Sequence, residues 1–246
     1  MKEQPAAWGL RWLAKMVTIS KRKKEFEKLF DPTKRYTLEE AISTVERFPK
    51  VKFDETVELH FRLNLNTKES DQSVRGTVIL PHGIGKKVRV AVFCKGELSQ
   101  KAQDAGADYV GANDLIEKVT KGFSDFDCVV ATPDMMRDLS KLGKILGPRG
   151  LMPSPKAGTV TQDVEKVVKE LKAGRIEFKA DKQAGIHVGI GKRSFTKEQL
   201  VDNARHVIEA INHAKPSAVK GTLVKTLSVS TTMGPGLSVL QSGTAE

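Results

Sequence analysis

Apolar and polar residues alternate strictly between positions 57 and 65, where Val, Leu and Phe occupy every second position and polar side chains lie between them. This period of two predicts a β-strand with one buried face and one solvent-exposed face. The stretches 74–80 and 223–229 have a similar pattern, and Thr and Ser occupy the open positions of the second. We therefore expect these strands to form one mainly antiparallel sheet with one wet face.

Two segments have the period of amphipathic helices. Thr37 and Glu40 have the spacing of a capping box, and apolar residues follow at helical spacing until Pro49 ends the segment. A second helix is predicted from about Lys197 to His213, with its apolar residues on one face. Helices on one face of a mainly antiparallel sheet form an α+β domain.

The middle of the chain has a different hydrophobic pattern, in which short apolar runs alternate with helical segments. Strands are predicted at 88–94, 108–110 and 128–131, and helices at 98–105, at 115–119 and from about residue 134. This order predicts a parallel sheet covered on both faces, as in three-layer Rossmann-like α/β domains. The middle segment is therefore expected to be a domain of its own.

Glycines are present at both places where the hydrophobic pattern of the sequence changes. Gly83 and Gly85 stand where the middle segment begins, and Gly174 stands where it ends. We expect an α/β domain at 84–174, inserted into a split α+β domain made of residues 1–83 and 175–246. The three glycines predict a hinge between the domains, because glycine absorbs backbone rotation at little steric cost.

The charge balance is strongly basic. Lys and Arg total 41 against 30 Asp and Glu, which gives a net charge of +11 and a pI near 9.6. Such an excess favours a polyanionic partner, because each neutralised phosphate releases condensed counterions. Residues 84–174 carry 15 basic and 12 acidic side chains, which leaves 26 and 18, a net charge of +8, for the split domain. We therefore expect the nucleic-acid contacts mainly on the split domain.

Aromatic residues make up only 6% of the chain. Single-stranded nucleic acid is commonly held by stacking successive bases on aromatic rings, so this mode of binding is not indicated. Recognition of the shape and phosphates of a folded RNA fits the composition better.

The glycine-rich motifs do not have the spacing that catalysis needs. Around Gly191-Lys192 and Gly85-Lys86 the glycine and hydroxyl positions of a phosphate-binding P-loop are missing, and no G-x-G-x-x-G opens the first helix of the middle segment. We see no catalytic triad, and we expect no catalytic residues, no cofactor and no enzyme.

The histidines and cysteines predict no metal site and no disulfide. The five histidines are on different predicted elements without ligand spacing, and His206 and His213, seven residues apart on one helix, are expected to be solvated. Cys94 and Cys128 are each in an apolar run, which is typical of small buried hydrophobes in a reducing cytoplasm. No apolar stretch approaches the roughly 20 residues that span a bilayer, so no membrane contact is expected.

Three further segments stand out for their residue types. The run 146–156 contains three prolines and two glycines with Arg149 and Lys156 on it, and it fits either an ordinary constrained loop or a loop that presents cations to phosphate. Residues 230–235 combine small hydroxyl side chains with an exposed Met-Gly turn, and residues 52–58 combine a cation, an aromatic ring and a hydroxyl.

Taken together, ordered motifs over residues 16–236 resemble the bacterial branch of the ribosomal protein L1 (uL1) family. The resemblance is carried by the following segments: Lys52-Phe-Asp-Glu-Thr-Val-Glu58, Val74-Arg-Gly-Thr77, Leu80-Pro-His-Gly83, Ala105-Gly-Ala-Asp-Tyr-Val110, Ala131-Thr-Pro-Asp134, Leu146-Gly-Pro-Arg-Gly150, Pro155-Lys-Ala-Gly-Thr159, Gly174-Arg-Ile-Glu-Phe178 and Thr231-Thr-Met-Gly234.

The resemblance implies a constituent of the large ribosomal subunit in the cytoplasm. The split domain is expected to bind large-subunit (23S) rRNA at the mobile lateral stalk near the exit site. The inserted domain is expected to lie near exit-site tRNA and to assist release of deacylated tRNA. Members of the family also bind the mRNA of their own operon and repress its translation. Outside the ribosome a monomer is expected.

The resemblance also assigns RNA-contact positions to particular residues. These are Lys52, Phe53, Thr56, Thr226, Thr232, Met233 and Gly234, with Lys179, Lys182 and His187 as weaker candidates. Position 226 is commonly serine in the family, and threonine keeps the hydroxyl while adding a methyl group. The strongest positions are expected to form a compact patch.

Two expectations concern the ends of the sequence. Met16 is followed by a basic run typical of the start of a ribosomal protein, so residues 1–15 are interpreted as an upstream extension. Residues 235–246 are rich in Gly and Ser and are expected to form a flexible tail.

Two alternatives from other classes remain to be tested. An RNA-modifying or nucleotide-hydrolysing enzyme would turn over ATP or GTP, and an architectural DNA-binding protein would bind duplex DNA as well as structured RNA at equal salt.

Overall fold

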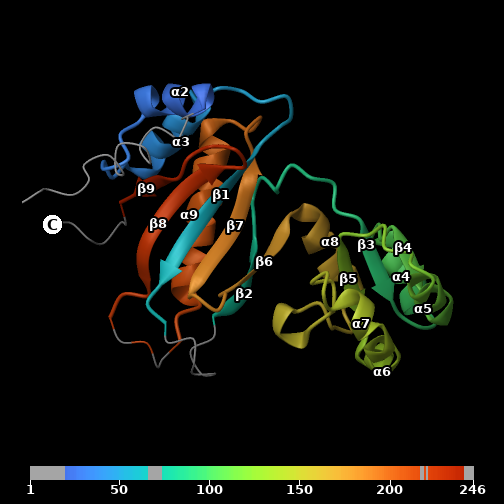
Figure 1. Ribbon diagram of the computed structural model, residues 1–246. Helices are drawn as coiled ribbons and strands as arrows, with labels where there is room; N and C mark the ends of the chain where they lie inside the picture. The colour runs from blue at the N-terminus through green and yellow to red at the C-terminus, as the bar shows by residue number, and fades with distance from the viewer. Residues whose placement is uncertain (1–19, 66–73, 217–218, 220, 241–246) are drawn as a thin grey trace, which may run out of the picture.

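The computed structural model describes residues 20–65, 74–216, 219 and 221–240. Figure 1 shows these residues gathered in two bodies, one built from both outer parts of the chain and one from its middle. Both bodies contain helices and sheets, so the predicted mixture of α and β structure is confirmed. The predicted extension at residues 1–15 and the start at Met16 lie outside the described residues.

The larger body contains helices α2, α3 and α9 and six strands. Their bounds are α2 Lys21–Leu29, α3 Leu38–Glu46, β1 Thr56–Leu63, β2 Arg75–Ile79, β6 Arg175–Lys179, β7 Gly185–Lys192, α9 Lys197–His213, β8 Val224–Thr231 and β9 Leu237–Val239. Strands β7, β1, β8 and β9 form a four-stranded antiparallel sheet in that order.

The strand at 74–80 was expected in the same sheet as the strand at 57–65, and this expectation was wrong. β2 pairs with β6 in a separate two-stranded antiparallel sheet. A strand has only two edges, and β7 and β8 occupy both edges of β1. β2 therefore cannot pair with β1, and its partner is β6, where the chain returns from the middle body.

Both long predicted helices are present as α3 and α9, and the capping box predicted at Thr37 and Glu40 is confirmed. The hydroxyl of Thr37 accepts from the amide of Glu40 while the Glu40 carboxylate accepts from the amide of Thr37, and Thr196 and Gln199 form a second reciprocal box. Together these pairs satisfy amides that would otherwise lack partners at the helix starts.

Helices α3 and α9 cover one face of the four-stranded sheet (Figure 1). The alternate residues Val57, Leu59, Phe61 and Leu63 of β1 are buried on that face, as the alternation predicted. No described helix covers the opposite face, which carries Thr56, Glu58, His60 and Arg62 from β1. We call this opposite side, with the matching residues of β7 and β8, the open face.

The smaller body has the predicted parallel strands. Its elements are β3 Val90–Phe93, α4 Leu98–Asp104, β4 Tyr109–Gly111, α5 Asn113–Thr120, β5 Cys128–Ala131, the 3-10 turns η2 Pro133–Met135, η3 Ser140–Leu142 and η4 Pro155–Ala157, and helices α6 Met136–Leu139, α7 Gly143–Leu146 and α8 Val164–Ala173. The strand order is β4-β3-β5. Successive residues of β3 enter two separate apolar clusters, so both faces of this sheet are covered as predicted.

The predicted hinge glycines lie where the two bodies are joined. Gly83, Gly85 and Gly174 all have positive φ angles, of 66°, 75° and 107°, which side-chain-bearing residues rarely adopt. A Cβ atom on Gly174 would collide with the backbone of Gly83, so the two connecting segments touch at this point. Glycine is therefore required both by conformation and by space.

Asn203 of α9 ties one connecting segment to the larger body. Its side chain is fully buried and donates to the carbonyls of Gly83 (3.0 Å) and Ile190 (2.7 Å), while its Oδ1 accepts from the amide of His82 (3.2 Å). Every polar atom of this buried amide has a partner, so burial costs little.

The expectation of a flexible tail after Gly234 was wrong for its first part. β9 pairs with β8, and both Leu237 and Val239 are buried. Alternation of two apolar side chains around Ser238 gives this short segment a buried face despite its glycine content. Residues 241–246 lie outside the described part of the chain.

Helices of the described part are all too short or too polar to cross a membrane.

Candidate RNA interface

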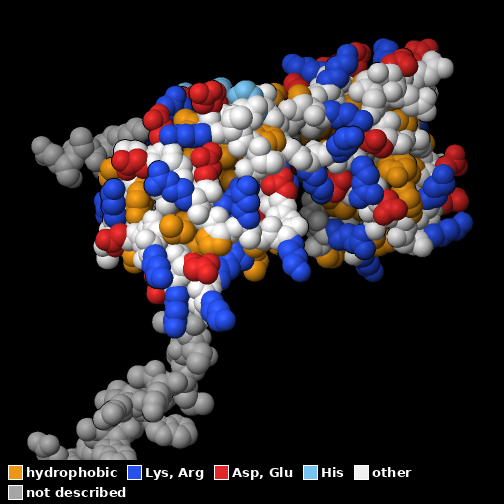
Figure 2. All heavy atoms as spheres, turned by 90° about the horizontal axis from the view of Figure 1, so that it is seen from above, with side chains coloured by type: hydrophobic (Ala, Val, Ile, Leu, Met, Phe, Trp, Pro, Cys, Tyr) orange, Lys and Arg blue, Asp and Glu red, His pale blue; other side chains and the backbone are white. Residues whose placement is uncertain are grey.

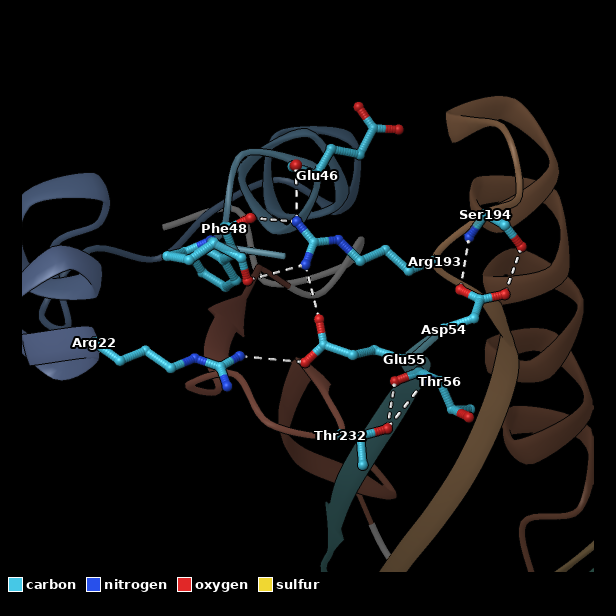
Figure 3. A network of polar contacts seen from close by, with 10 residues as sticks. Arg22, Glu46, Phe48, Asp54, Glu55, Thr56, Arg193, Ser194 and Thr232 are labelled. Atoms are coloured by element: carbon cyan, nitrogen blue, oxygen red, sulfur yellow. Dashed lines mark hydrogen bonds and ion pairs between the residues drawn. The ribbon is translucent and has the colours of Figure 1, made fainter. Parts of the chain in front are cut away.

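Thr56 and Thr232 join the start of β1 to the residue after β8. The amide of Thr232 donates to the Thr56 carbonyl (3.1 Å), and the amide of Thr56 donates to the Thr232 hydroxyl (3.0 Å) (Figure 3). The predicted contact residues Phe53 and Met233 flank this bridge along the chain, and their exposed fractions are 53% and 54%. The structure therefore leaves two large apolar side chains exposed close along the chain to the bridge, where a binding partner can cover them.

Gly234 keeps the turn after Thr232 tight. A Cβ atom at this position would collide with the hydroxyl oxygen of Thr231 and press on the ring of Phe48. The Gly234 amide donates to the Thr231 carbonyl (3.0 Å). The turn therefore requires glycine for packing, and it leaves Met233 exposed.

Lys192, which follows Gly191 in a segment that lacks the spacing of a P-loop, lies at this end of the sheet. The ammonium group of Lys192, the last residue of β7, donates to the Thr56 hydroxyl across 2.8 Å. Because Lys192 fills an acceptor position of that hydroxyl, the hydroxyl hydrogen is available for an acceptor on a ligand. Lys52 is exposed on the preceding loop and adds a second cation.

A buried carboxylate fixes the loop that carries Lys52 and Phe53. Glu55 is 1% exposed and accepts from Arg193 (2.7 Å) and from Arg22 of α2 (3.4 Å) (Figure 3). The guanidinium of Arg193 also donates to the carbonyls of Glu46 (3.0 Å), Phe48 and Pro49 (3.3 Å). Charge-assisted hydrogen bonds from two arginines to one buried carboxylate restrict the geometry of this loop.

Sequence reasoning missed this network because its members are far apart along the chain. Glu55 and Arg193 are separated by 138 positions, and neither has a distinctive local spacing. Asp54 adds a second link, since its carboxylate accepts from the hydroxyl (2.7 Å) and the amide (3.2 Å) of Ser194.

The expectation of one compact patch was wrong for Thr226, which lies away from the Thr56–Thr232 bridge. Thr226 is exposed on β8 but pairs with Arg62, whereas Thr231 pairs with Val57 near the other end of β1. Thr226 and Thr232 are six positions apart along the chain, which is roughly 20 Å at the usual rise per residue of a strand. The candidates instead mark two ends of the open face.

His60 and His187 lie between those two ends. The strand register pairs them across β1 and β7, and their Nδ1 atoms are 2.8 Å apart. The Nε2 atom of His60 is 2.7 Å from the hydroxyl of Ser230 on β8. The two histidines are on different elements, as expected, and the antiparallel register brings them together although they are 127 positions apart. His206 and His213 are both exposed on α9, as predicted.

The environment of His60 lowers its pKa. Burial makes the largest contribution, followed by the nearby His187, while the carboxylate of Glu58 acts in the opposite direction. Asp181, in the turn between β6 and β7, lies 4.0 Å from Nε2 of His187. Among the described residues, no three His, Cys, Asp or Glu side chains are grouped so that they could hold a metal ion.

The two remaining candidates lie beside the four-stranded sheet. Lys179 ends β6 and pairs with Arg75 of β2 in the two-stranded sheet. Lys182 lies in the turn that leads into β7. These lysines are therefore placed at the border of the open face rather than on it.

Charge alone does not single out one surface in the view from above. Figure 2 shows Lys and Arg side chains on both bodies, with Asp and Glu among them. The site is therefore defined by the residues at its two ends and its centre rather than by one continuous basic stripe.

The described residues thus define a basic protein of mixed α/β structure, whose candidate site is an open sheet face rather than an enclosed pocket. Residues 43–235 match the family described as the ribosomal protein L1p/L10e family. The chain belongs to this family, which consists of ribosomal proteins rather than enzymes.

Relatives match nearly the whole chain. It is 55% identical over 221 residues to large ribosomal subunit protein uL1 of Thermosipho melanesiensis, covering 89% of this chain and 95% of the relative. It is 54% identical over 220 residues to large ribosomal subunit protein uL1 of Protochlamydia amoebophila, covering 89% and 93%. The resemblance based on short motifs is confirmed by these matches.

Proposed function

We propose that the chain is a structural constituent of the large ribosomal subunit and that its open face binds large-subunit rRNA directly. The observation that carries this proposal is the Thr56–Thr232 bridge flanked by exposed Phe53 and Met233. Apolar side chains can pack on ribose and base surfaces, while Lys52 and the Thr56 hydroxyl can contact phosphate and 2′-OH groups. Membership of a ribosomal protein family supports RNA as the partner.

We assign this binding to a split α+β domain made of residues 1–83 and 175–246, with residues 84–174 as an inserted three-layer Rossmann-like domain. The separate apolar clusters of the two bodies support the division. Gly83, Gly85 and Gly174 would then form the hinge, and their positive φ angles at the connecting segments support that role.

The inserted domain is proposed to lie at the lateral stalk near exit-site tRNA and to assist release of deacylated tRNA. Arg149 and Lys156 are exposed on the proline-rich loop of this body, and Lys144 is exposed at its start. A constrained loop with exposed cations suits contact with a phosphate backbone.

Repression of the operon's own mRNA is proposed to use the same open face. A messenger RNA that imitates the rRNA element would compete for one set of contacts, so the two activities would exclude each other. Outside the ribosome the protein is proposed to act as a monomer.

Binding to rRNA transcribed in vitro tests the proposal. Large-subunit rRNA from the genome that encodes the chain should bind the wild-type protein more tightly than duplex DNA does at the same salt concentration. A Phe53→Ala, Met233→Ala double variant should bind this rRNA at least ten-fold more weakly.

The matched control is Ile79→Ala. Ile79 is a comparable exposed hydrophobic, at 47%, on β2 away from the open face. Its removal should leave affinity unchanged. Equal binding to duplex DNA, or an equal loss of affinity in the control and the double variant, would contradict the proposal.

A further inference from the structure

The two imidazoles of His60 and His187 occupy the middle of the open face. On β1, His60 lies between Thr56, at the end bridged to Thr232, and Arg62, which pairs with Thr226. The side chain of His187 is 60% exposed. A ligand that spans both ends of the proposed interface must therefore pass over this pair.

The short distance between the rings restricts their protonation. With the two Nδ1 atoms 2.8 Å apart, one Nδ1–H donates and the other Nδ1 accepts. Two Nδ1–H groups cannot face each other at this separation, so the pair holds either no positive charge or one. When it holds one, both Nε2 atoms carry hydrogen, and that of the exposed His187 can be donated to a ligand.

The charged groups around the pair come from each neighbouring element. Glu58 and Arg62 lie on β1, Asp181 lies in the turn before β7, and Lys192 ends β7. The β8 residues beside His60 on the open face are the uncharged Ser228 and Ser230.

In the free protein, the surroundings of His60 disfavour the charged form of its imidazole. Burial and the facing ring of His187 lower the pKa of His60, and Glu58 opposes them only in part. A phosphate bound at the exposed His187 would add negative charge beside the pair and favour its protonated form.

We propose that the His60–His187 pair is a proton-linked phosphate contact, which takes up one proton when the open face binds rRNA; this inference rests on the proposed function. The sign follows from linkage. A pair protonated in the complex and neutral in the free protein gives affinity that rises as pH falls through the pKa of the complex. The affinity stops increasing at pH values below the pKa of the free pair, because the pair is then protonated in both states.

Affinity measured against pH tests this inference. The dissociation constant for in vitro transcribed large-subunit rRNA should fall about ten-fold between pH 8.0 and 6.0 at constant ionic strength, as expected for uptake of at most one proton. A His60→Gln, His187→Gln double variant should lose most of this dependence. Both side chains are on the sheet surface, and circular dichroism verifies that the variant is folded.

The matched control replaces His206 and His213 of α9, which covers the buried side of the sheet, with glutamine. This control should keep the wild-type pH dependence. Histidine pKa values followed by NMR should also rise for His60 or His187 when RNA binds, which a purely structural role would not produce.

Wild-type affinity independent of pH, or an unchanged pH dependence in the His60/His187 variant, would overturn this inference alone. Failure of the wild-type protein to bind the rRNA at any pH would overturn the proposed function as well.

Discussion

The amide of Thr56 donates to the hydroxyl of Thr232 across 3.0 Å, although the two residues are 176 positions apart. This hydrogen bond joins two of the sequence motifs that resemble the family. It also means that the Thr232 hydroxyl holds the site together, so its effect on RNA affinity includes positioning of its neighbours.

Thr232→Val should weaken rRNA binding without unfolding the protein. Valine keeps the shape but cannot accept from the Thr56 amide, and loss of one such partner costs about 1–3 kcal/mol. Thr232→Ser keeps the hydroxyl and should retain most of the affinity. Filter binding measures the rRNA affinity of both variants. Equal affinities for the Val and Ser variants would show that this hydrogen bond does not contribute to rRNA binding.

Arg193→Leu should lower the free energy of unfolding by about 3 kcal/mol, because it leaves the buried Glu55 carboxylate with only the longer contact to Arg22. Urea denaturation measures the change. Glu165→Gln removes the exposed pair with Lys169 and should leave the denaturation midpoint unchanged. A similar midpoint for both variants would show that the Glu55 network does not stabilise the fold.

Lys52→Met should reduce the salt dependence of rRNA binding. If Lys52 neutralises one phosphate, the slope of log affinity against log salt concentration falls by about one. Lys166→Met, on α8 of the smaller body, provides the control. Titrations at several salt concentrations give the slopes, and the same slope for wild type and Lys52→Met would exclude a phosphate contact there.

Gly174→Ala should destabilise the protein more than Gly96→Ala. Both glycines have positive φ, which costs a side-chain-bearing residue on the order of 1 kcal/mol, but only at Gly174 would the added Cβ meet the backbone of Gly83. Thermal denaturation compares the two variants. Equal melting temperatures would contradict the close contact of the connecting segments.

Periodic segments of the sequence predicted the fold well. Strand β1 and helix α9 follow the apolar positions because each buries one face against the other. Helix α2 was not predicted, since only Phe26 of its nine residues is buried and the helix therefore lacks an apolar stripe. Its place is set by tertiary contacts, including the packing of Phe26 on Phe48.

The site was predictable only where local motifs carried it. Phe53 and Met233 stood in recognisable segments, and the structure leaves both exposed. The His60–His187 pair and the Glu55–Arg193 ion pair depend on strand register and loop packing, which no local spacing encodes. The sequence around Lys192 does not have the spacing of a P-loop. The contact of Lys192 with Thr56 depends on the pairing of β1 with β7, which the sequence does not encode locally.

Site-directed photo-crosslinking in assembled large subunits tests the central claim most directly. A photoreactive phenylalanine analogue at position 53 should crosslink to large-subunit rRNA, and the same group at position 79 should not. Crosslinks from position 53 to ribosomal proteins alone, or equal rRNA crosslinking from both positions, would contradict binding of rRNA by the open face.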